Sequence, residues 1–584
     1  MSRIFEIADQ YVNEIAALDP TLSTALGIPG HEREMPDYSP DGTAAVADLN
    51  RRTVGDLESA APDGERDRIA RDFMRERLSV RLALVEAKEN LRELRIIASP
   101  MQGARSVFDQ MPKESEEDWS NIAARLKLVP EALAGFRASL NEGIAQGLVA
   151  AKRQSRECQR QAEIWSGQRE GEPGFFDLLL GTFEKFRSEP SPPALSHGVG
   201  EGESRERPVS TALAKDVEAG VQAAKDGYAE MARYLRDEYE PKANEEEAAG
   251  EDRYRLMNRV FLGASIDLKE TYEWGWEEQW RIDREMEETA AKIADGGSVD
   301  DAMEILEHDP SRCVDGVDAY QSWLQELHDE ALEALHGMHF DIDERIRRIE
   351  VMIPPPGGAL APYYSGPSED FKRPGRTWWP TGTRTVFPKW SAVSTAYHEG
   401  VPGHHLQVGS SRCLGDKMSR FQSLLGFVSG YGEGWALYAE RLMGELGFLE
   451  NPDYYMGLLS AQALRACRVI VDIGMHLELK IPENEKFHPG EVWNHDLARE
   501  FVTVRSRQEP EFVKSEIVRY LGWPGQAISY KVGERKWLEV REAAKRKAGA
   551  SFDLKQFHTD VLDLGPLGLE QLEREMGGVG VSGK

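Results

Sequence analysis

The chain has 584 residues, of which 40% are hydrophobic and 29% charged, and its formal net charge is -30. This length and composition are typical of a soluble globular protein with one large body or several domains. So much negative charge disfavours binding to nucleic acid or to anionic membrane surfaces. No apolar run reaches the roughly 20 residues that a transmembrane helix requires, so we predict neither a nucleic-acid nor a membrane partner.

The first twenty residues predict a helix rather than a secretion signal. Phe5, Ala8, Val12 and Ile15 recur three and four residues apart, which is the spacing of one helical face. The segment lacks the basic start and the unbroken apolar core of a signal peptide. The four cysteines are far apart and form no C-x-x-C pair. We therefore expect a cytoplasmic protein with reduced thiols.

Most of the remaining chain also predicts helix. Apolar residues recur at helical spacing around residues 80–94, 214–240 and 266–294, with charged residues between them. Alternating patterns typical of strands are scarce. We expect a mainly α fold with at most a small edge sheet, for which residues 383–387, "TRTVF", are the candidate strand.

Two irregular stretches interrupt the helices. Residues 188–208 are rich in Pro, Gly and Ser and predict an exposed loop. Residues 354–388 are irregular but aromatic, and a long irregular segment in a compact protein is often functional. We expect a mostly helical N-terminal lobe over residues 1–350 and a catalytic lobe over residues 351–584, joined in one continuous catalytic unit.

The stretch "HEGVPGHHLQ", residues 398–407, is similar to the zinc-protease signature H-E-x-x-H. That signature works because residues four apart share one helical face, but here the fourth residue after His398 is Pro402. In a straight helix His405 returns to the face of His398 only about 10 Å along the axis. That distance is too long for one zinc ion with bonds of about 2 Å.

Pro402 and Gly403 change this geometry. A proline inside a helix clashes with the carbonyl of the residue four positions earlier, and the glycine relaxes the backbone further. The helix is therefore expected to bulge or kink. A bulge that absorbs two extra residues would carry His404 to the place of the second histidine, which gives an expanded motif H-E-x-x-P-G-H.

This interpretation assigns His398 and His404 as zinc ligands and Glu399 as the general base that acts on a water. His405 is the competing second ligand, and otherwise donates a hydrogen bond to a ligand or to the substrate. A catalytic zinc also needs a third ligand and one open position.

The stretch "GYGEGWALYAERL", from Gly430, offers the third ligand. Glu433 lies between glycines that allow close backbone approach, and we assign it to the metal. Glu440 follows seven residues later on the same helical face, and we expect it to orient a histidine.

Two later stretches, "RACRVIVDIGMHLEL" and "RYLGWPGQAISYKVGERK", hold residues that could stabilise the negative charge that develops on a carbonyl oxygen during hydrolysis. We favour Tyr530 and Tyr520 as donors, with His476 as the weaker third choice. Asp472 lies four residues before His476, at helical spacing, and is expected to support it. The alternative for both stretches is a structural salt-bridge network and an aromatic core.

Residues around the turn "WPGQ" are candidates for substrate binding. Arg519 or Lys531 could bind the C-terminal carboxylate of a peptide, since both side chains suit that ligand. Gln526 is the third candidate.

The motifs HEGVPGHHLQ, GEGWALYAE, RACRVIVDIGMH and YLGWPGQAISYKVG together resemble the bacterial "domain of unknown function 885" family. The resemblance covers nearly the whole chain and implies a gluzincin-type metallopeptidase. It further implies a two-lobed, all-helical fold with a deep central channel, similar to thimet oligopeptidase, neurolysin and angiotensin-converting enzyme. In those enzymes a glycine commonly precedes the second histidine, as Gly403 precedes His404.

We therefore expect a metallopeptidase that holds one Zn²⁺ per chain and hydrolyses short peptides. One alternative is an amidase that acts on a non-peptide amide at the same site. The other is a peptide-binding protein whose metal site is vestigial. The sequence does not distinguish exopeptidase from endopeptidase action and does not indicate the oligomeric state. The same ligands could also hold manganese, cobalt or iron in place of zinc.

Overall fold

The computed structural model describes residues 2–188, 209–354, 361–368 and 370–577. These residues form a mainly helical protein with two small sheets, as the sequence predicts. No helix among them combines the length and the apolar character needed to cross a bilayer. The predicted loop at 188–208 begins at the last residue of a helix, and its remaining residues lie outside the described part of the chain.

The chain divides into two units. The first consists of residues 1–9, 57–80 and 248–584, and the second of residues 10–56 and 81–247. The boundary therefore differs from the one expected near residue 350, because residues 248–350 pack with the unit that carries the histidine motif. In particular, the helix over residues 268–293 lies along the helix over residues 452–476.

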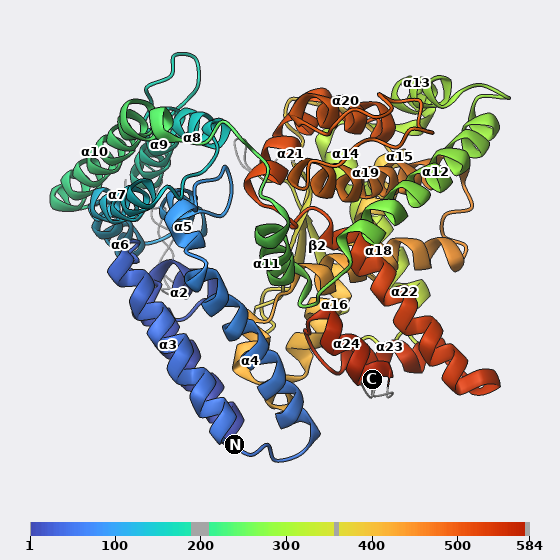
Figure 1. The fold of residues 1–584 in the computed structure, drawn as a ribbon, viewed down its shortest axis with the longest axis horizontal. Helices are drawn as coiled ribbons and strands as arrows, with labels where there is room; N and C mark the ends of the chain where they lie inside the picture. Colours follow the sequence, from blue (N-terminus) through green and yellow to red (C-terminus); the bar gives the residue numbers. More distant parts are fainter. Residues whose placement is uncertain (1, 189–208, 355–360, 369, 578–584) are drawn as a thin grey trace, which may run out of the picture. The chain divides into compact units, whose positions relative to one another are not determined.

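The second unit is a helical assembly with its own apolar core. The helices from the N-terminus to residue 234 are α1 (Arg3–Leu18), α2 (Pro20–Leu26), α3 (Pro40–Ser59), α4 (Glu65–Glu86), α5 (Pro100–Gln110), α6 (Glu116–Leu126), α7 (Val129–Gln146), α8 (Lys152–Trp165), α9 (Phe175–Ser188) and α10 (Thr211–Tyr234). The long α10 packs against α6, α7, α8 and α9 (Figure 1). Trp119, Phe183 and Tyr228 lie in the core between them.

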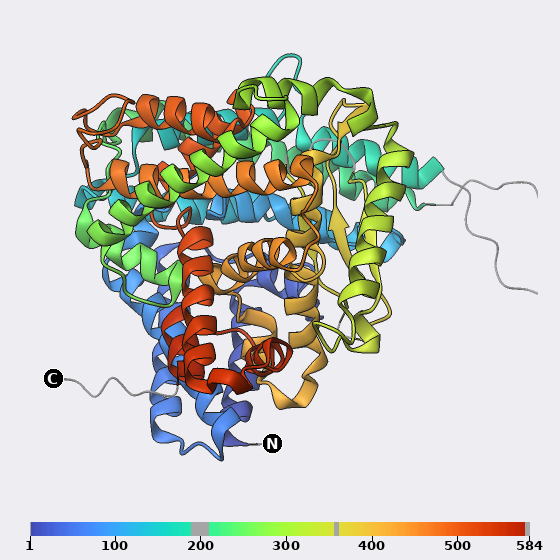
Figure 2. The same ribbon diagram turned by 90° about the vertical axis from the view of Figure 1, so that its right-hand side faces the viewer.

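Most of α4, with the first residues of α1 and the last of α3, belongs to the first unit, which also contains the remaining helices. They are α11 (Glu251–Leu262), α12 (Leu268–Ile293), α13 (Val299–His308), α14 (Val317–Leu335), α15 (Trp390–Glu399), α16 (His404–Cys413), α17 (Arg420–Leu425), α18 (Ser429–Glu445), α19 (Pro452–His476), α20 (His495–Ser506), α21 (Pro510–Gly522), α22 (Ser529–Ala548), α23 (Leu554–Leu562) and α24 (Leu569–Gly577). The helix α19 is buried along most of its length. It runs beside α12 and also packs on α15 and α20 (Figures 1 and 2).

Two small sheets lie in the first unit. In the three-stranded sheet, β4 (Gly375–Trp378) lies between β2 (Ile349–Met352), which is parallel to it, and β3 (Tyr363–Ser365), which is antiparallel. This larger sheet packs on α16 through β3 and β4. The other sheet pairs β1 (Cys313–Asp315) with β5 (Val386–Pro388) in antiparallel register. The strand predicted at residues 383–387 therefore exists but begins at Val386.

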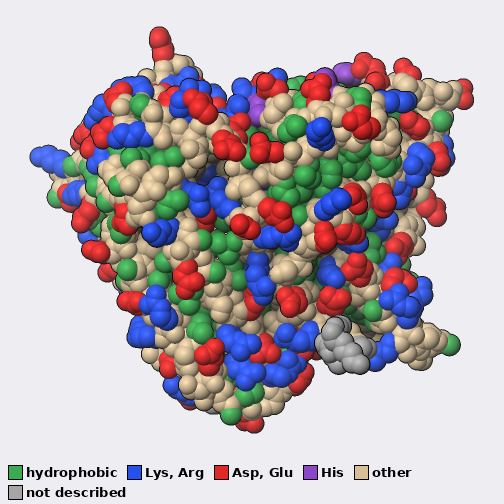
Figure 3. Space-filling model, viewed as in Figure 1, with side chains coloured by type: hydrophobic (Ala, Val, Ile, Leu, Met, Phe, Trp, Pro, Cys, Tyr) green, Lys and Arg blue, Asp and Glu red, His purple; other side chains and the backbone are tan. Residues whose placement is uncertain are grey.

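Charged side chains of both signs cover much of the surface. On the face in Figure 3 acidic and basic residues are interspersed, so the excess of negative charge is not gathered into one patch on this face.

Candidate metal centre

The helix that carries His398 ends one residue later, and a second helix begins at His404. The expected bulge is therefore a complete break between α15 and α16, spanned by a four-residue turn. The amide of Gly403 donates to the carbonyl of Tyr397 at 3.0 Å, and the amide of His405 donates to Gly400 at 3.0 Å. The turn also contains a cis peptide bond before Pro402.

Close packing explains why glycine stands at both ends of this turn. A Cβ atom on Gly403 would lie 2.0 Å from the carbonyl oxygen of His398, and one on Gly400 would lie 2.5 Å from the ring of His328. Neither position has room for a side chain. The indole of Trp435 holds the turn from α18, since its Nε1 donates to the carbonyls of Pro402 at 2.8 Å and Gly403 at 3.2 Å.

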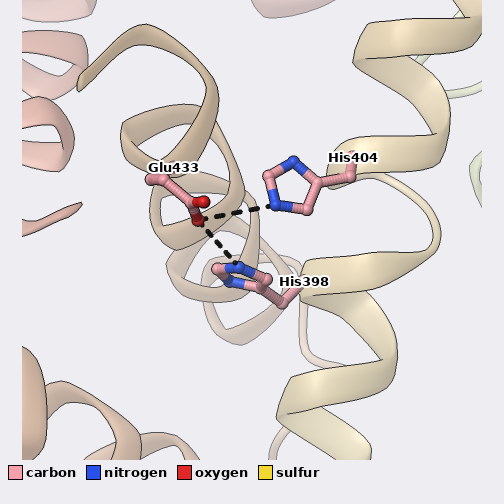
Figure 4. A group of neighbouring side chains, drawn as sticks. All are labelled: His398, His404 and Glu433. Atoms are coloured by element: carbon pink, nitrogen blue, oxygen red, sulfur yellow. Dashed lines mark ion pairs between the residues drawn. The ribbon is translucent and has the colours of Figure 1, made fainter. Parts of the chain in front are cut away.

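The break brings the three predicted ligands together. His398, His404 and Glu433 each offer one ligand atom, and these atoms all lie within 4.8 Å of one another. Oε2 of Glu433 lies 3.4 Å from Nε2 of His398 and 3.5 Å from Nε2 of His404. The side chains come from three helices, α15, α16 and α18, and point toward one another (Figure 4).

A second carboxylate holds the other side of His398, as predicted for Glu440. Its Oε1 lies 2.8 Å from Nδ1 of His398, and its other oxygen accepts a hydrogen bond from the hydroxyl of Ser394. Arg465 approaches the same carboxylate at 3.9 Å. Glu440 is fully buried. This arrangement fixes the ring of His398 so that Nε2 faces Glu433.

The electrostatics of the cluster suit a cation. Burial opposes the charge on His398, but the carboxylates of Glu433 and Glu440 outweigh it and raise the pKa of the ring to about 10. Burial also disfavours the charged form of Glu433, yet the hydrogen bonds from the two histidines lower the pKa of this carboxyl well below its usual range. The negative charge at the centre is therefore retained down to low pH.

Glu399 lies in the same buried environment. Burial raises the pKa of its carboxyl, while the charges of His398 and His404 act in the opposite direction. A carboxylate with a raised pKa is a stronger base and takes up a proton more readily than an exposed one. This position and this shift match the requirements of a general base.

His405, the competing ligand, faces away from the cluster. Its Nε2 lies 2.8 Å from the carbonyl oxygen of Ile346, and its Nδ1 lies 3.0 Å from the hydroxyl of Tyr364. Burial lowers the pKa of the ring to about 4. Both ring nitrogens are therefore engaged, and the geometry favours His404 over His405.

Of the two predicted oxyanion donors, the structure places only Tyr530 near the metal ligands. Burial, followed by the charge of Glu433, raises the pKa of Tyr530 to about 12, and among the described residues its hydroxyl has no hydrogen-bond partner. The hydroxyl of Tyr520 instead donates to Glu516 at 2.8 Å and accepts from Arg468 at 2.9 Å. Tyr520 thus belongs to a buried ionic network.

His476 and Asp472 also lie outside the cluster. The two ring nitrogens of His476 contact the amide of Ala249 at 3.2 Å and the carbonyl of Tyr520 at 3.1 Å. Asp472 accepts from the Tyr254 hydroxyl at 2.7 Å and orients no metal ligand. The structure therefore supports the structural alternative for this pair.

The three predicted substrate-binding residues are held by protein groups. Arg519 binds both oxygens of Glu516, at 2.8 and 3.0 Å, and also donates to Gln526. Lys531 is 1% exposed and lies 2.6 Å from Glu534 and 3.1 Å from Glu278. Lys531 is therefore enclosed in an ion cluster of its own and is not available to a substrate carboxylate.

Several residues that shape the site could not be assigned a role from the sequence. They are Ser394, Trp435, Tyr364 and Arg465. Of these, Trp435 lies inside the motif "GEGWALYAE", so its position close to the predicted ligand Glu433 could have indicated a role at the site. The contacts of the others depend on tertiary packing that no local pattern encodes.

The chain belongs to the family described as "Bacterial protein of unknown function (DUF885)", whose model matches residues 20–576. This confirms the family resemblance. A crystal structure titled as a putative lipoprotein from Colwellia psychrerythraea matches with a TM-score of 0.81, at 21% identity over 99% of each chain. A putative lipoprotein of unknown function from Shewanella oneidensis matches with a TM-score of 0.72, at 16% identity over 99% of this chain and 100% of that one. No curated protein matches, and these similarities concern the fold alone.

Proposed function

We propose that this protein is a zinc-dependent metallopeptidase that hydrolyses short peptides. The observation that carries the proposal is the spacing of the ligand atoms. A tetrahedral zinc with bonds of about 2.0–2.1 Å requires ligand atoms about 3.4 Å apart. The two distances from Glu433 to the histidines, 3.4 and 3.5 Å, fit that requirement.

The set of donor atoms fits zinc as well. Two imidazole nitrogens and one carboxylate oxygen form the ligand set of many catalytic zinc sites, which leave one position open. The contact between Glu440 and His398 is the supporting hydrogen bond that such ligands usually have. Zinc bound here would polarise a substrate carbonyl and activate a water for attack.

The protein residues supply the remaining functions. The carboxylate of Glu399 accepts a proton from the attacking water and passes it to the amine that leaves. The hydroxyl of Tyr530 stays protonated at neutral pH and can donate to the carbonyl oxygen as its negative charge grows. We further propose that the two helical units correspond to the two lobes of helical oligopeptidases. The proposal includes a deep channel for the substrate, as in those enzymes.

The test is peptide hydrolysis by the zinc-loaded protein and by its Glu399→Gln variant. We expect the wild type to cleave a mixture of short peptides. The variant is expected to lose about a hundredfold or more of kcat while its zinc content stays unchanged. Glu450→Gln, which alters an exposed carboxylate, is the matched control and should stay active.

Each other outcome has a defined meaning. Retained hydrolysis in Glu399→Gln would contradict the assigned base. Cleavage of small amides without cleavage of any peptide would favour the amidase alternative, with the same site. A folded protein that takes up no zinc and cleaves neither would favour the peptide-binding alternative with a vestigial metal site.

A further inference from the structure

Two buried arginines next to Tyr530 share a single carboxylate. Glu516 accepts from Arg468 at 2.7 Å and from Arg519 at 2.8 Å, through the same oxygen. Tyr520 also donates to this carboxylate but brings no charge. The hydrogen-bonded cluster therefore retains one positive charge that none of its members balances.

The two arginines differ in their free donors. All three guanidinium nitrogens of Arg519 are engaged, by Glu516 and Gln526. Arg468 uses Nε and Nη2, for Tyr520 and Glu516, and its Nη1 has no hydrogen-bond partner within the described chain. Arg468 is only 6% exposed. A largely buried guanidinium with an unused donor calls for an anionic partner.

This donor lies beside the proposed metal centre. The guanidinium carbon of Arg468 is 4.6 Å from the centre of the Tyr530 ring. Tyr530 and Glu433 lie where α18 and α22 cross in backbone contact, since a Cβ on Gly434 would be 2.5 Å from Gly533. The hydroxyls of Ser429 and Ser529 touch across the same crossing at 2.7 Å. Tyr530 is thus close both to Arg468 and to Glu433.

The spacing defines which anion would be recognised. One extended peptide residue spans about 3.3–3.6 Å, so one or two residues cover the 4.6 Å between the Arg468 guanidinium carbon and the centre of the Tyr530 ring. If Tyr530 donates to the carbonyl of the scissile bond, the group that reaches Arg468 lies one or two residues further along the substrate. A free α-carboxylate at that point matches the planar, forked guanidinium.

We propose that Arg468 binds the C-terminal carboxylate of the substrate, so that the enzyme releases residues from the C-terminal end of short peptides. Water is added across one of the last peptide bonds, which yields a shortened peptide with a new carboxylate and a released amine. This inference rests on the proposed peptidase function. It replaces Arg519 and Lys531, the candidates that the sequence suggested, by Arg468.

The test measures binding rather than turnover. We would use the zinc-loaded Glu399→Gln protein and compare one short peptide with a free C-terminus against the same peptide with a C-terminal amide. The free acid is expected to bind about tenfold more tightly or better, the range of a hydrogen bond to a charged group. In Arg468→Gln, made in the same background, the ratio of the two affinities is expected to fall to about one.

The ratio is internal to each protein, so a smaller folded fraction does not change it. Arg535→Gln, which alters a part-exposed arginine over Trp274, is the matched control and should keep the preference. If Arg468→Gln does not fold, Arg468→Met, which keeps a long unbranched side chain in the buried position and leaves the pair between Arg519 and Glu516 in place, provides the same readout. An unchanged ratio in either variant would overturn the assignment.

The two proposals fail in different ways. Equal affinity for acid and amide, in a protein whose wild type hydrolyses peptides, would overturn the carboxylate site and leave the peptidase intact. A preference for the acid that depends on Arg468, in a protein without hydrolysis, would support the carboxylate site and contradict the peptidase.

Discussion

The carboxylate of Glu440 lies 2.8 Å from Nδ1 of His398, on the side of the ring opposite Glu433. This contact makes the ring orientation of the first ligand depend on a residue 42 positions later in the chain. Glu440→Gln is predicted to weaken zinc binding about 10–100-fold, the usual effect of losing such a supporting partner. Zinc affinity measured against a competing chelator checks it.

The matched control for that prediction is Glu445→Gln, since Glu445 lies on the same helix but faces Arg541 at the surface. The control should bind zinc as the wild type does. An unchanged affinity in Glu440→Gln would show that Ser394 and the surrounding packing hold His398 without the carboxylate.

Substitution of Gly403 by alanine should disrupt the turn between α15 and α16. The added Cβ would lie 2.0 Å from the carbonyl oxygen of His398, and relief of this overlap requires the backbone to move. We predict a loss of unfolding free energy of about 1–3 kcal/mol, the range for overpacking, together with weaker zinc binding. Chemical denaturation and zinc titration measure the two effects.

Gly181→Ala is the control for this substitution, because a Cβ on Gly181 would meet nothing within 4 Å. It should be neutral or slightly stabilising, since alanine favours a helix interior over glycine. Equal behaviour of the two variants would contradict the packing argument.

His405→Gln is predicted to keep the metal and to lower stability. The substitution removes a ring that contacts both Ile346 and Tyr364. Each buried group left without a partner costs about 1–3 kcal/mol. His404→Gln should show the reverse pattern, with little loss of stability in the zinc-free protein and loss of zinc. Zinc content and denaturation of both variants decide between the histidines.

Acidification should destabilise the fold through its buried histidines. Burial lowers the pKa of His405 and His476 to about 4 and of His328 and His558 to about 3. Because these folded values lie below the ordinary value of 6.5, the unfolded chain binds more protons. The stability they confer is fully present above pH 6.5 and is lost as the pH falls toward 4 and 3.

The variant His558→Gln isolates one of these contributions. His558 contacts the Tyr438 hydroxyl at 2.7 Å. The slope of unfolding free energy against pH, between about pH 5 and 6, should fall by about 1.4 kcal/mol per pH unit. His308→Gln, at the surface, is the control. Asp472 acts in the opposite direction, because burial raises its pKa to about 7, so the comparison of slopes rather than their absolute values is decisive.

The predictions from the sequence succeeded where a local pattern carries the information. Helical spacing around residues 266–294 predicted α12 almost to its ends. The spacing of His398, His404 and Glu433 predicted a cluster that the structure brings together. Clustered metal-ligating side chains and flanking glycines are properties of the sequence itself, so they can be found without coordinates.

The predictions were less accurate where tertiary packing decides. A proline within a helical pattern predicts a disturbance, but only the contacts of Gly400 and Gly403 make it a complete break. Tyr520 and Tyr530 are equivalent as sequence, yet one hydroxyl is engaged by Glu516 and Arg468. The partner of a polar side chain thus depends on residues far away in the chain.

The most direct test of the account is the number of zinc ions bound per chain, measured after zinc loading and removal of excess metal. The account predicts about one zinc per chain for the wild type, as expected of a single catalytic site, and none for His404→Gln at the same zinc concentration. A wild-type protein that is folded and holds no zinc, or a His404→Gln variant that holds as much as the wild type, would contradict it.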